Sequence, residues 1–234
     1  GVMGLLFGAG LAFASQKFAV EVDPRAVAVR DALPSANCGA CGYPGCDGFA
    51  NAVVAGKAPV NGCPVGVQET ADKVAEIMGV VADAGEKNVA RVICKGGENC
   101  LNRFEYDGIK DCKAENIING GGAKACTYGC LGGGTCVEAC PFDAMFINDD
   151  GIAEVDKEKC TACGVCIEVC PKNVIELVPY KQAVVVDCVN TERGGHVKKN
   201  CSNACIACTL CVKVCPHDAI HVENNIAKID YEKC

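Results

Sequence analysis

The sequence contains no tryptophan, and aromatic residues make up only 5% of its 234 residues. Large aromatic side chains usually supply much of the buried area of a core, so this chain needs another source of stability. Histidine is also scarce, with three residues. No Ser/His/Asp arrangement, phosphate-binding loop or dinucleotide fingerprint is evident, which argues against a hydrolase or a nucleotide-dependent enzyme.

A net positive charge is absent as well, because 22 Lys and Arg residues are outnumbered by 29 Asp and Glu residues; the formal net charge is −7 and the isoelectric point is about 5.0. This balance argues against nucleic acid as a partner.

The chain also lacks a complete membrane-spanning run, because residues 1–14 are uncharged but shorter than the roughly 20 residues that a bilayer requires. The first residue is not methionine, and we expect residues 1–20 to be the C-terminal part of a single transmembrane helix. A buried core helix and a signal-peptide segment are the alternatives.

Three basic residues follow this run, at Lys17, Arg25 and Arg30. Positive charges near a membrane helix favour the cytoplasmic side. We therefore expect everything downstream to lie in the cytoplasm.

What the chain has in abundance is cysteine, with 22 residues, and glycine, with 27. A cysteine content of this size indicates either a disulfide scaffold or metal ligation. Disulfide-rich domains are short and secreted, whereas this chain is long and its cysteines fall in tight CxxC runs followed by proline. The pattern favours metal ligation in a reducing compartment.

The most specific motif is the run Cys160-xx-Cys163-xx-Cys166-xxx-Cys170-Pro. Three closely spaced thiolates bind three corners of a [4Fe–4S] cluster, and the fourth cysteine of such a run ligates the other cluster in two-cluster ferredoxins. Zinc sites use two separated CxxC pairs instead. The predicted ligand sets are Cys140, Cys160, Cys163 and Cys166 for one cluster, and Cys130, Cys136 and Cys170 for its neighbour.

The neighbouring motif departs from this pattern, because Gly133 stands where a cysteine is expected in the run CLGGGTC. Cys126, four residues before Cys130, is the candidate replacement. The alternative is that Cys126 belongs to another cluster.

An internal duplication extends the array. Four cysteines and a following proline recur 75 residues later, and the second copy restores the complete motif. Its fourth ligand is expected beyond residue 234, and Cys215 and Cys234 would begin the cluster after that. The matched pairs are Cys126 with Cys201, Cys130 with Cys205, Cys136 with Cys211, and Cys140 with Cys215; Cys208 completes the second motif.

A different cysteine set lies near the N-terminus, at Cys38, Cys41, Cys46 and Cys63. Three cysteines in a glycine-rich loop plus a remote fourth suit another [4Fe–4S] site, with zinc as the alternative. Glycine lets backbone amides approach and bond the sulfurs, which raises the reduction potential.

The remaining cysteines have no assigned motif. Cys94, Cys100 and Cys112 could bind a further cluster whose fourth ligand is not evident. Cys188 and Cys201 could be ligands or buried thiols.

The fold class expected is α+β: a partial N-terminal transmembrane helix, a small α-helical 4Fe-4S domain, and tandem bacterial-ferredoxin-like βαβ dicluster modules. Asp23 and Pro24 start a connecting helix that Pro34 ends, another helix runs from Val67 to Met78, and β-hairpins turn at 149–151 and 224–225. Elements this short need the clusters for stability. The expected divisions are 1–20, the membrane helix; 21–34, the connecting helix; 35–80, the N-terminal 4Fe-4S domain; 90–180, the first ferredoxin-like module; and 181–234, the second.

Several segments together resemble the B subunit of the Rnf complex. They are LFGAGLAFASQKFAVEVDPRAVAVRDALPSANCGACGYPGCDGFANAV, then KDC, KACTYGCLGGGTCVEACPFDA and the ferredoxin repeats. The resemblance covers nearly the whole chain and implies a subunit of an ion-pumping ferredoxin:NAD⁺ oxidoreductase in the bacterial inner membrane. It implies that Cys38, Cys41, Cys46 and Cys63 bind the membrane-proximal cluster, and that electrons pass from reduced ferredoxin towards membrane partners. This sequence is similar to the long members of the family, with more ferredoxin motifs.

Two other functions stay open from the sequence. One is a polyferredoxin-like relay module of a hydrogenase or an acetyl-CoA-pathway complex, against which the expected membrane helix argues. The other is a non-redox metal protein, against which the number of motifs argues. For the two electron-relay functions, the Rnf-type subunit and the polyferredoxin-like module, we expect at least three complete clusters in this chain and no catalytic residue.

Overall fold

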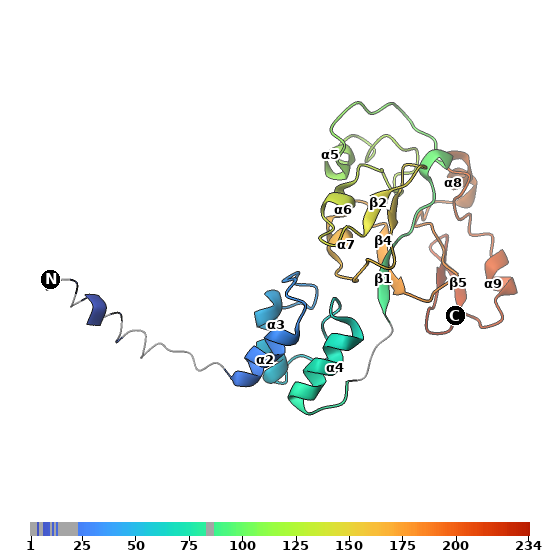
Figure 1. The fold of residues 1–234 in the computed structure, drawn as a ribbon. Helices are drawn as coiled ribbons and strands as arrows, with labels where there is room; N and C mark the ends of the chain where they lie inside the picture. Colours follow the sequence, from blue (N-terminus) through green and yellow to red (C-terminus); the bar gives the residue numbers. More distant parts are fainter. Residues whose placement is uncertain (1–3, 5–6, 10, 12, 14–22, 83–86) are drawn as a thin grey trace. The chain divides into compact units, whose positions relative to one another are not determined.

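The computed structural model describes residues 4, 7–9, 11, 13, 23–82 and 87–234. The chain divides into two compact units, one formed by residues 1–63 and 68–83 and the other by residues 64–67 and 84–234. Figure 1 shows the helices of the first unit in blue to cyan and the mixed helices and strands of the second in green to red. Each unit is described by itself below.

Within residues 23–82, the first unit has three helices: α2 (Pro24–Ala32), α3 (Gly45–Val54) and α4 (Val67–Met78). The predicted start of α2 is confirmed, because the Asp23 side chain accepts a hydrogen bond from the backbone N of Arg25 at 2.8 Å. The predicted bounds of α4 are confirmed too, and Gly79 follows it with a φ of 68° that favours glycine.

The core of this unit is small and combines aliphatic side chains with one buried aromatic ring. Phe49 and Val53 on α3, Val29 on α2 and Val74 on α4 are almost completely buried. Tyr43 packs its ring edge-on against Phe49, with ring centroids 5.9 Å apart. Three of the four N-terminal cysteines, Cys41, Cys46 and Cys63, pack against this core.

The second unit contains three two-stranded antiparallel sheets within its described residues. Strand β1 (Asn88–Val92) pairs with β4 (Ile175–Pro179), with Ala90 opposite Leu177. The other two sheets are local hairpins, β2 (Met145–Ile147) with β3 (Ala153–Val155), and β5 (Ile220–Glu223) with β6 (Ile226–Ile229). Both hairpins are where the sequence predicts them.

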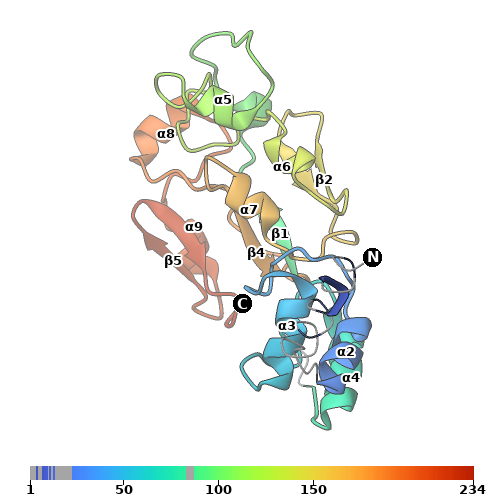
Figure 2. The ribbon, with the colours of Figure 1, turned by 90° about the vertical axis from the view of Figure 1, so that its left-hand side faces the viewer.

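The turns of the two hairpins use residues suited to a left-handed backbone. Asn224 and Asn225 have φ values of 50° and 61°, and Gly151 has a φ of 72°. Asparagine and glycine are favoured in tight hairpin turns for this reason. Figure 2 shows the β5–β6 hairpin beside α9, away from the β1–β4 sheet.

Short helices complete the second unit, and most of them adjoin a cysteine. Helices α6 and α7 each begin directly after a glycine in the left-handed conformation, Gly134 and Gly164. These elements are η1 (Gly97–Asn99), α5 (Cys112–Asn116), α6 (Thr135–Glu138), α7 (Val165–Val169), α8 (Gly194–Asn200) and α9 (Leu210–Val214).

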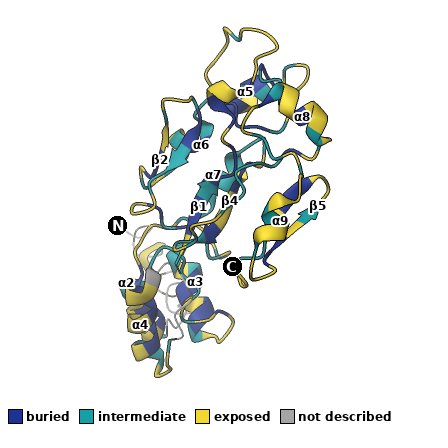
Figure 3. Ribbon diagram, turned by 90° about the vertical axis from the view of Figure 1, so that its right-hand side faces the viewer, coloured by how far each residue is buried: buried dark blue, intermediate teal, exposed yellow. Residues whose placement is uncertain are grey.

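Cysteine is a major part of the core of the second unit. The principal buried cluster joins Val89, Val174 and Val178 of the β1–β4 sheet region to five buried cysteines. In Figure 3 the buried positions concentrate along β1, β4 and the loops beside α6 and α7. The five cysteines in this core are Cys94, Cys130, Cys136, Cys160 and Cys166.

Among the described residues, no helix is long and apolar enough to cross a membrane. The predicted membrane segment, residues 1–20, falls mostly outside the described residues. Ferredoxin-like α+β structure is present in the second unit, as predicted.

Candidate iron–sulfur centres

Three cysteine loops of the second unit share one backbone conformation. Each loop runs between the first and last cysteines of a motif, and the second and fourth residues after the first cysteine have positive φ. These pairs are Gly132 and Gly134 (80° and 81°), Ala162 and Gly164 (56° and 81°), and Ala207 and Thr209 (55° and 62°). Positive φ is uncommon outside glycine. Its repetition at two alanines and a threonine indicates that all three loops require the same backbone conformation, whichever residue stands there.

Such alternation turns successive backbone N–H groups towards the inside of the loop, where they can meet an anionic group. Backbone N–H groups also donate hydrogen bonds to cysteine sulfurs close to these loops. The backbone N of Ala90 donates to Sγ of Cys160 at 3.3 Å, and the N of Ala144 donates to Sγ of Cys140 at 3.4 Å. The second copy repeats the latter bond from Ala219 to Cys215, also at 3.4 Å.

The first ferredoxin site consists of the four cysteines predicted to share a cluster. They line one pocket between α7 and the β2 side of the unit. Burial, and after it the neighbouring thiols of Cys163, Cys160 and Cys140, raises the pKa of Cys166 to about 12. The structure therefore brings together Cys140, Cys160, Cys163 and Cys166.

The second ferredoxin site shows which cysteine stands in for the one missing at Gly133. A Cβ added at Gly133 would lie 3.2 Å from Sγ of Cys112. Burial, and after it the thiols of Cys130, Cys112 and Cys170, raises the pKa of Cys136 to about 12. The structure thus brings together Cys112, Cys130, Cys136 and Cys170.

This finding changes the interpretation of Cys126. Cys112, rather than Cys126, occupies the space left by Gly133, so the structure favours the alternative in which Cys126 belongs to another site. Thr135 holds Cys112 in place, since its Oγ1 accepts a hydrogen bond from the Cys112 backbone N at 2.8 Å. The hydroxyl of Thr135 in turn donates to Asp111 at 2.7 Å.

Cys38 and Cys41 lie in the loop before α3, Cys46 is in the first turn of α3, and Cys63 lies in the segment after the helix. Asn37 ties this loop to the helix, because its Oδ1 accepts a hydrogen bond from the backbone N of Cys46 at 2.9 Å. Gly39, Gly42 and Gly45 all have positive φ in this loop. All four cysteines, Cys38, Cys41, Cys46 and Cys63, are half-buried.

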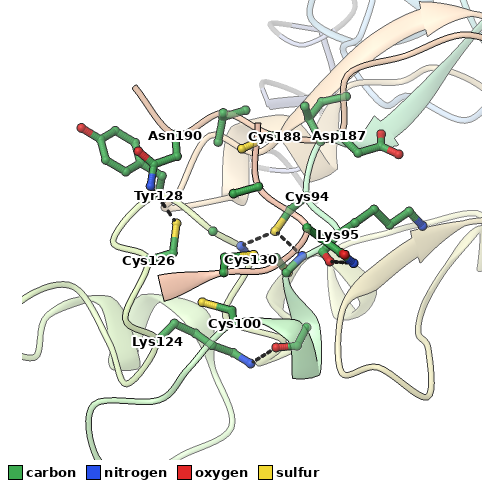
Figure 4. Close-up of a pocket in the computed structure, with 18 residues that line it drawn as sticks. Cys94, Lys95, Cys100, Lys124, Cys126, Tyr128, Cys130, Asp187, Cys188 and Asn190 are labelled. Carbon is green, nitrogen blue, oxygen red and sulfur yellow. Dashed lines mark hydrogen bonds between the residues drawn. The ribbon is translucent and has the colours of Figure 1, made fainter. Parts of the chain in front are cut away.

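A further pocket of the second unit is lined by six cysteines. Figure 4 shows Sγ of Cys94 accepting hydrogen bonds from the backbone N of Gly96 and of Cys130, both at 3.4 Å. The second copy approaches this pocket through Cys188 and Cys201. The lining cysteines are Cys94, Cys100, Cys126, Cys130, Cys188 and Cys201.

The remaining cysteines of the second copy are more open. Cys208 and Cys234 are exposed, whereas Cys205, Cys211 and Cys215 are half-buried. Cys188 lies near Cys205, because the backbone of Cys205 hydrogen-bonds to it and the Cys205 thiol raises the pKa of Cys188 after burial does.

As the structure places them, the described cysteines form neither disulfides nor a site for a single metal ion. All 22 cysteines are within the described residues, and none forms a disulfide. Across the described residues, no three Cys, His, Asp or Glu side chains are placed to hold one metal ion. Four thiolates around a single zinc stand about 3.8 Å apart, given tetrahedral Zn–S bonds of about 2.3 Å. Each cubane thiolate binds a different iron, so cluster ligands are spaced more widely.

Family models match the same segments. Residues 33–65 match a model described as a putative Fe-S cluster. Residues 123–177 and 159–219 each match a 4Fe-4S dicluster domain. The chain therefore carries several [4Fe–4S] clusters.

Whole-chain relatives decide the family. The chain is 55% identical to the B subunit of the Na(+)-translocating ferredoxin:NAD(+) oxidoreductase complex of Acetobacterium woodii, over 100% of this chain and 70% of that protein. It is 48% identical to the B subunit of the proton-translocating ferredoxin:NAD(+) oxidoreductase complex of Clostridium ljungdahlii, over 100% of this chain and 82% of that protein. This chain belongs to the family of Rnf B subunits. The B subunit of an ion-translocating oxidoreductase complex of Methanosarcina acetivorans is 41% identical over 99% of this chain and 88% of that protein.

Membership of the Rnf B-subunit family, together with the 4Fe-4S domains, makes the chain an iron–sulfur electron-transfer subunit of a membrane-associated complex. One functional residue is not evident from motif spacing, namely Cys112 as a member of the second ferredoxin site. A signal for it is present in the chain, since Asp111-Cys112 in the first copy matches Asp187-Cys188 in the second one residue out of register.

Proposed function

We propose that the chain accepts electrons from reduced ferredoxin and passes them through its clusters to membrane subunits of a Rnf-type complex. NAD⁺ reduction and ion translocation then take place in other subunits. The helix within residues 1–20 anchors the chain in the bilayer by a single pass, and the cluster units lie on the cytoplasmic side. The observation that carries the proposal is the set of three cysteine loops with one repeated backbone conformation.

Three ligand sets follow from the grouping of the cysteines. The N-terminal site uses Cys38, Cys41, Cys46 and Cys63. The first ferredoxin site uses Cys140, Cys160, Cys163 and Cys166. The second ferredoxin site uses Cys112, Cys130, Cys136 and Cys170.

A bound [4Fe–4S] cluster supplies reversible one-electron chemistry, and its potential depends on charge, solvent exposure and hydrogen bonds to sulfur. The protein contributes burial and donors. Cys136, Cys160 and Cys166 are at most 8% exposed, which keeps water from the ligands. The amide of Ala90 donates to Cys160, which stabilises negative charge on that sulfur.

The two ferredoxin sites adjoin one another. The Cys166 thiol of the first site contributes to the raised pKa of Cys136 in the second. Helices α6 and α7, which carry Cys136 and Cys166, pack against each other, and both cysteines belong to one buried cluster. This proximity supports a relay, because electron transfer between clusters requires close approach.

The first test is the iron, acid-labile sulfide and zinc content of the anaerobically purified chain. Each cluster carries about four irons, so the three sites predict at least about twelve irons with matching sulfide and little zinc, and any further cluster adds about four more. Iron equal to one cluster, or zinc in its place, would contradict the relay.

The second test is electron transfer. Reduced ferredoxin mixed anaerobically with the oxidised chain should bleach its visible absorbance. A Cys160→Ala/Cys166→Ala variant should show a smaller change, whereas Gln68→Ala, at an exposed side chain on α4 that donates to Asp72, should match the parent chain. No bleaching of an iron-loaded parent chain would refute ferredoxin as the donor.

A further inference from the structure

Four cysteines outside the three ligand sets come together from distant parts of the chain. Cys94 and Cys100 flank the loop after β1, Cys126 precedes the second ferredoxin site, and Cys201 follows α8. Cys126 and Cys201 are matching positions of the two copies, 75 residues apart. The sequence suggests a shared site for Cys94 and Cys100 with Cys112, but it joins neither of them to Cys126 or Cys201, and neither dicluster match includes Cys94 or Cys100.

The geometry points to a fourth [4Fe–4S] site in this chain, the bridging site, held by Cys94, Cys100, Cys126 and Cys201. This inference rests on the proposed electron relay. It adds a site that requires residues from both copies of the repeat.

Two glycines leave the space into which these thiols project. A Cβ added at Gly96 would lie 3.5 Å from Sγ of Cys94 and 3.7 Å from Sγ of Cys201. A Cβ added at Gly129 would lie 3.5 Å from Sγ of Cys94 and 3.6 Å from Sγ of Cys126. Gly96 has a φ of −67°, so its backbone does not require glycine and its missing side chain matters for space.

The backbone holds the fourth cysteine beside this space. Cys100 and Cys201 form an isolated antiparallel bridge. The flanking bonds run from the N of Leu101 to the O of Asn200 at 2.9 Å, and from the N of Ser202 to the O of Asn99 at 3.0 Å. These bonds fasten the start of the second copy to the first.

Burial and hydrogen bonding resemble those of the ferredoxin sites. All four cysteines are 9% exposed or less, and three of them form a buried cluster of their own. Sγ of Cys94 accepts two backbone N–H bonds. Sγ of Cys126 accepts a bond from Nδ2 of Asn190 at 3.4 Å, and Asn190 is only 1% exposed. Buried amides directed at sulfur are the donors that tune an iron–sulfur cluster.

The position of the bridging site explains what it would do. The backbone N that donates to Cys94 belongs to Cys130, a ligand of the second ferredoxin site. On the other side, Cys188 lies near both Cys126 and Cys205. One electron arriving from the reduced second ferredoxin site would pass to the bridging site and then to the second copy, with no proton or bond exchanged.

The experiment compares iron and sulfide in the full chain and in a Cys94→Ala/Cys201→Ala variant. We expect a loss of about four irons and four sulfides per chain, with the remaining cluster signals in electron paramagnetic resonance unchanged. Unchanged iron and sulfide would overturn the inference. If the double variant lost zinc rather than iron relative to the full chain, the inference would be overturned too. The same holds if Cys188→Ala lowered the iron content and Cys201→Ala did not.

A second variant covers the case in which the double variant does not fold. Asn190→Asp keeps the side-chain shape but places a carboxylate beside Cys126. We expect full iron content and one cluster potential shifted to a more negative value, because a donor to sulfur is replaced by negative charge. Asn225→Asp is the matched control, since Asn225 donates only to the backbone O of Thr191 and is exposed.

The outcomes separate the two proposals. Equal shifts in both asparagine variants, or no shift in Asn190→Asp, would overturn the bridging site while leaving the relay intact. A parent chain without iron would refute the relay itself.

Discussion

Replacing Gly133 with alanine tests how Cys112 enters the second ferredoxin site. The new Cβ would lie 2.9 Å from the backbone N of Cys112 and 3.0 Å from the carbonyl carbon of Asp111. This backbone is not free to move, because the Cys112 N is bonded to Thr135 and Asp111 caps α5 by accepting a hydrogen bond from the N of Ala114 at 2.7 Å. We therefore expect Gly133→Ala to displace Cys112 from its site.

Two magnitudes follow. Overpacking of a rigid core costs about 1–3 kcal/mol of unfolding free energy. Unfolding slopes in guanidinium chloride are roughly 2–6 kcal/mol per molar, so the unfolding midpoint should fall by roughly 0.5 M. Displacement of one ligand should also remove between about one and four irons per chain.

The assay is anaerobic unfolding followed by visible absorbance, together with iron and sulfide content. Gly195→Ala is the matched control, because Gly195 is exposed in α8 and its added Cβ would meet no atom within 4 Å. That variant should keep all its iron and gain up to about 1 kcal/mol. Full iron content and an unchanged midpoint in Gly133→Ala would refute the assignment of Cys112.

Three further predictions concern stability. Asn37→Ala should destabilise the first unit by about 0.5–2 kcal/mol, because the side chain caps the start of α3 through Cys46; calorimetry should show no loss in Asn37→Asp. Asp187→Asn should cost about 1–2 kcal/mol in chemical unfolding, because the carboxylate accepts two hydrogen bonds from Arg91, each at 2.8 Å, at a partly exposed pair; a change near zero would contradict this. Burial and then the carboxylate of Glu176 raise the pKa of Tyr231 to about 12 from an ordinary value of about 10. The folded state thus favours the neutral phenol, so stability should fall as pH rises from about 10 to about 12, and Tyr231→Phe should flatten that slope.

Local structure was predictable from the sequence because local residues determine it. Asp23 and Pro24 start α2, and Asn224 and Asn225 turn the β5–β6 hairpin, each through preferences confined to a few residues. The motif Cys160-xx-Cys163-xx-Cys166 likewise carries its own loop geometry. These features needed no knowledge of the rest of the fold.

The grouping of distant cysteines was not predictable in the same way. Sequence spacing predicts that Cys126, four residues before Cys130, replaces the cysteine missing at Gly133, whereas the structure places Cys112 beside that position. What decides between them is the path of α5, whose backbone occupies the space that a side chain at position 133 would fill. The approach of Cys201 to Cys94 depends on the pairing of Cys100 with Cys201, which no local spacing encodes.

The buried thiols show why iron and fold depend on one another in this chain. Burial raises the pKa of Cys130 to about 11 and that of Cys136 to about 12, so without metal these positions hold neutral thiols. Thiolates at the same positions would carry uncompensated buried charge, which is costly. A bound cation reverses this balance and deprotonates a coordinating thiol.

The strands are only three to five residues long, and two-stranded sheets of that size are marginal alone. Metal binding is then a source of folding free energy, and the core that positions the relay is built from the ligands of the relay.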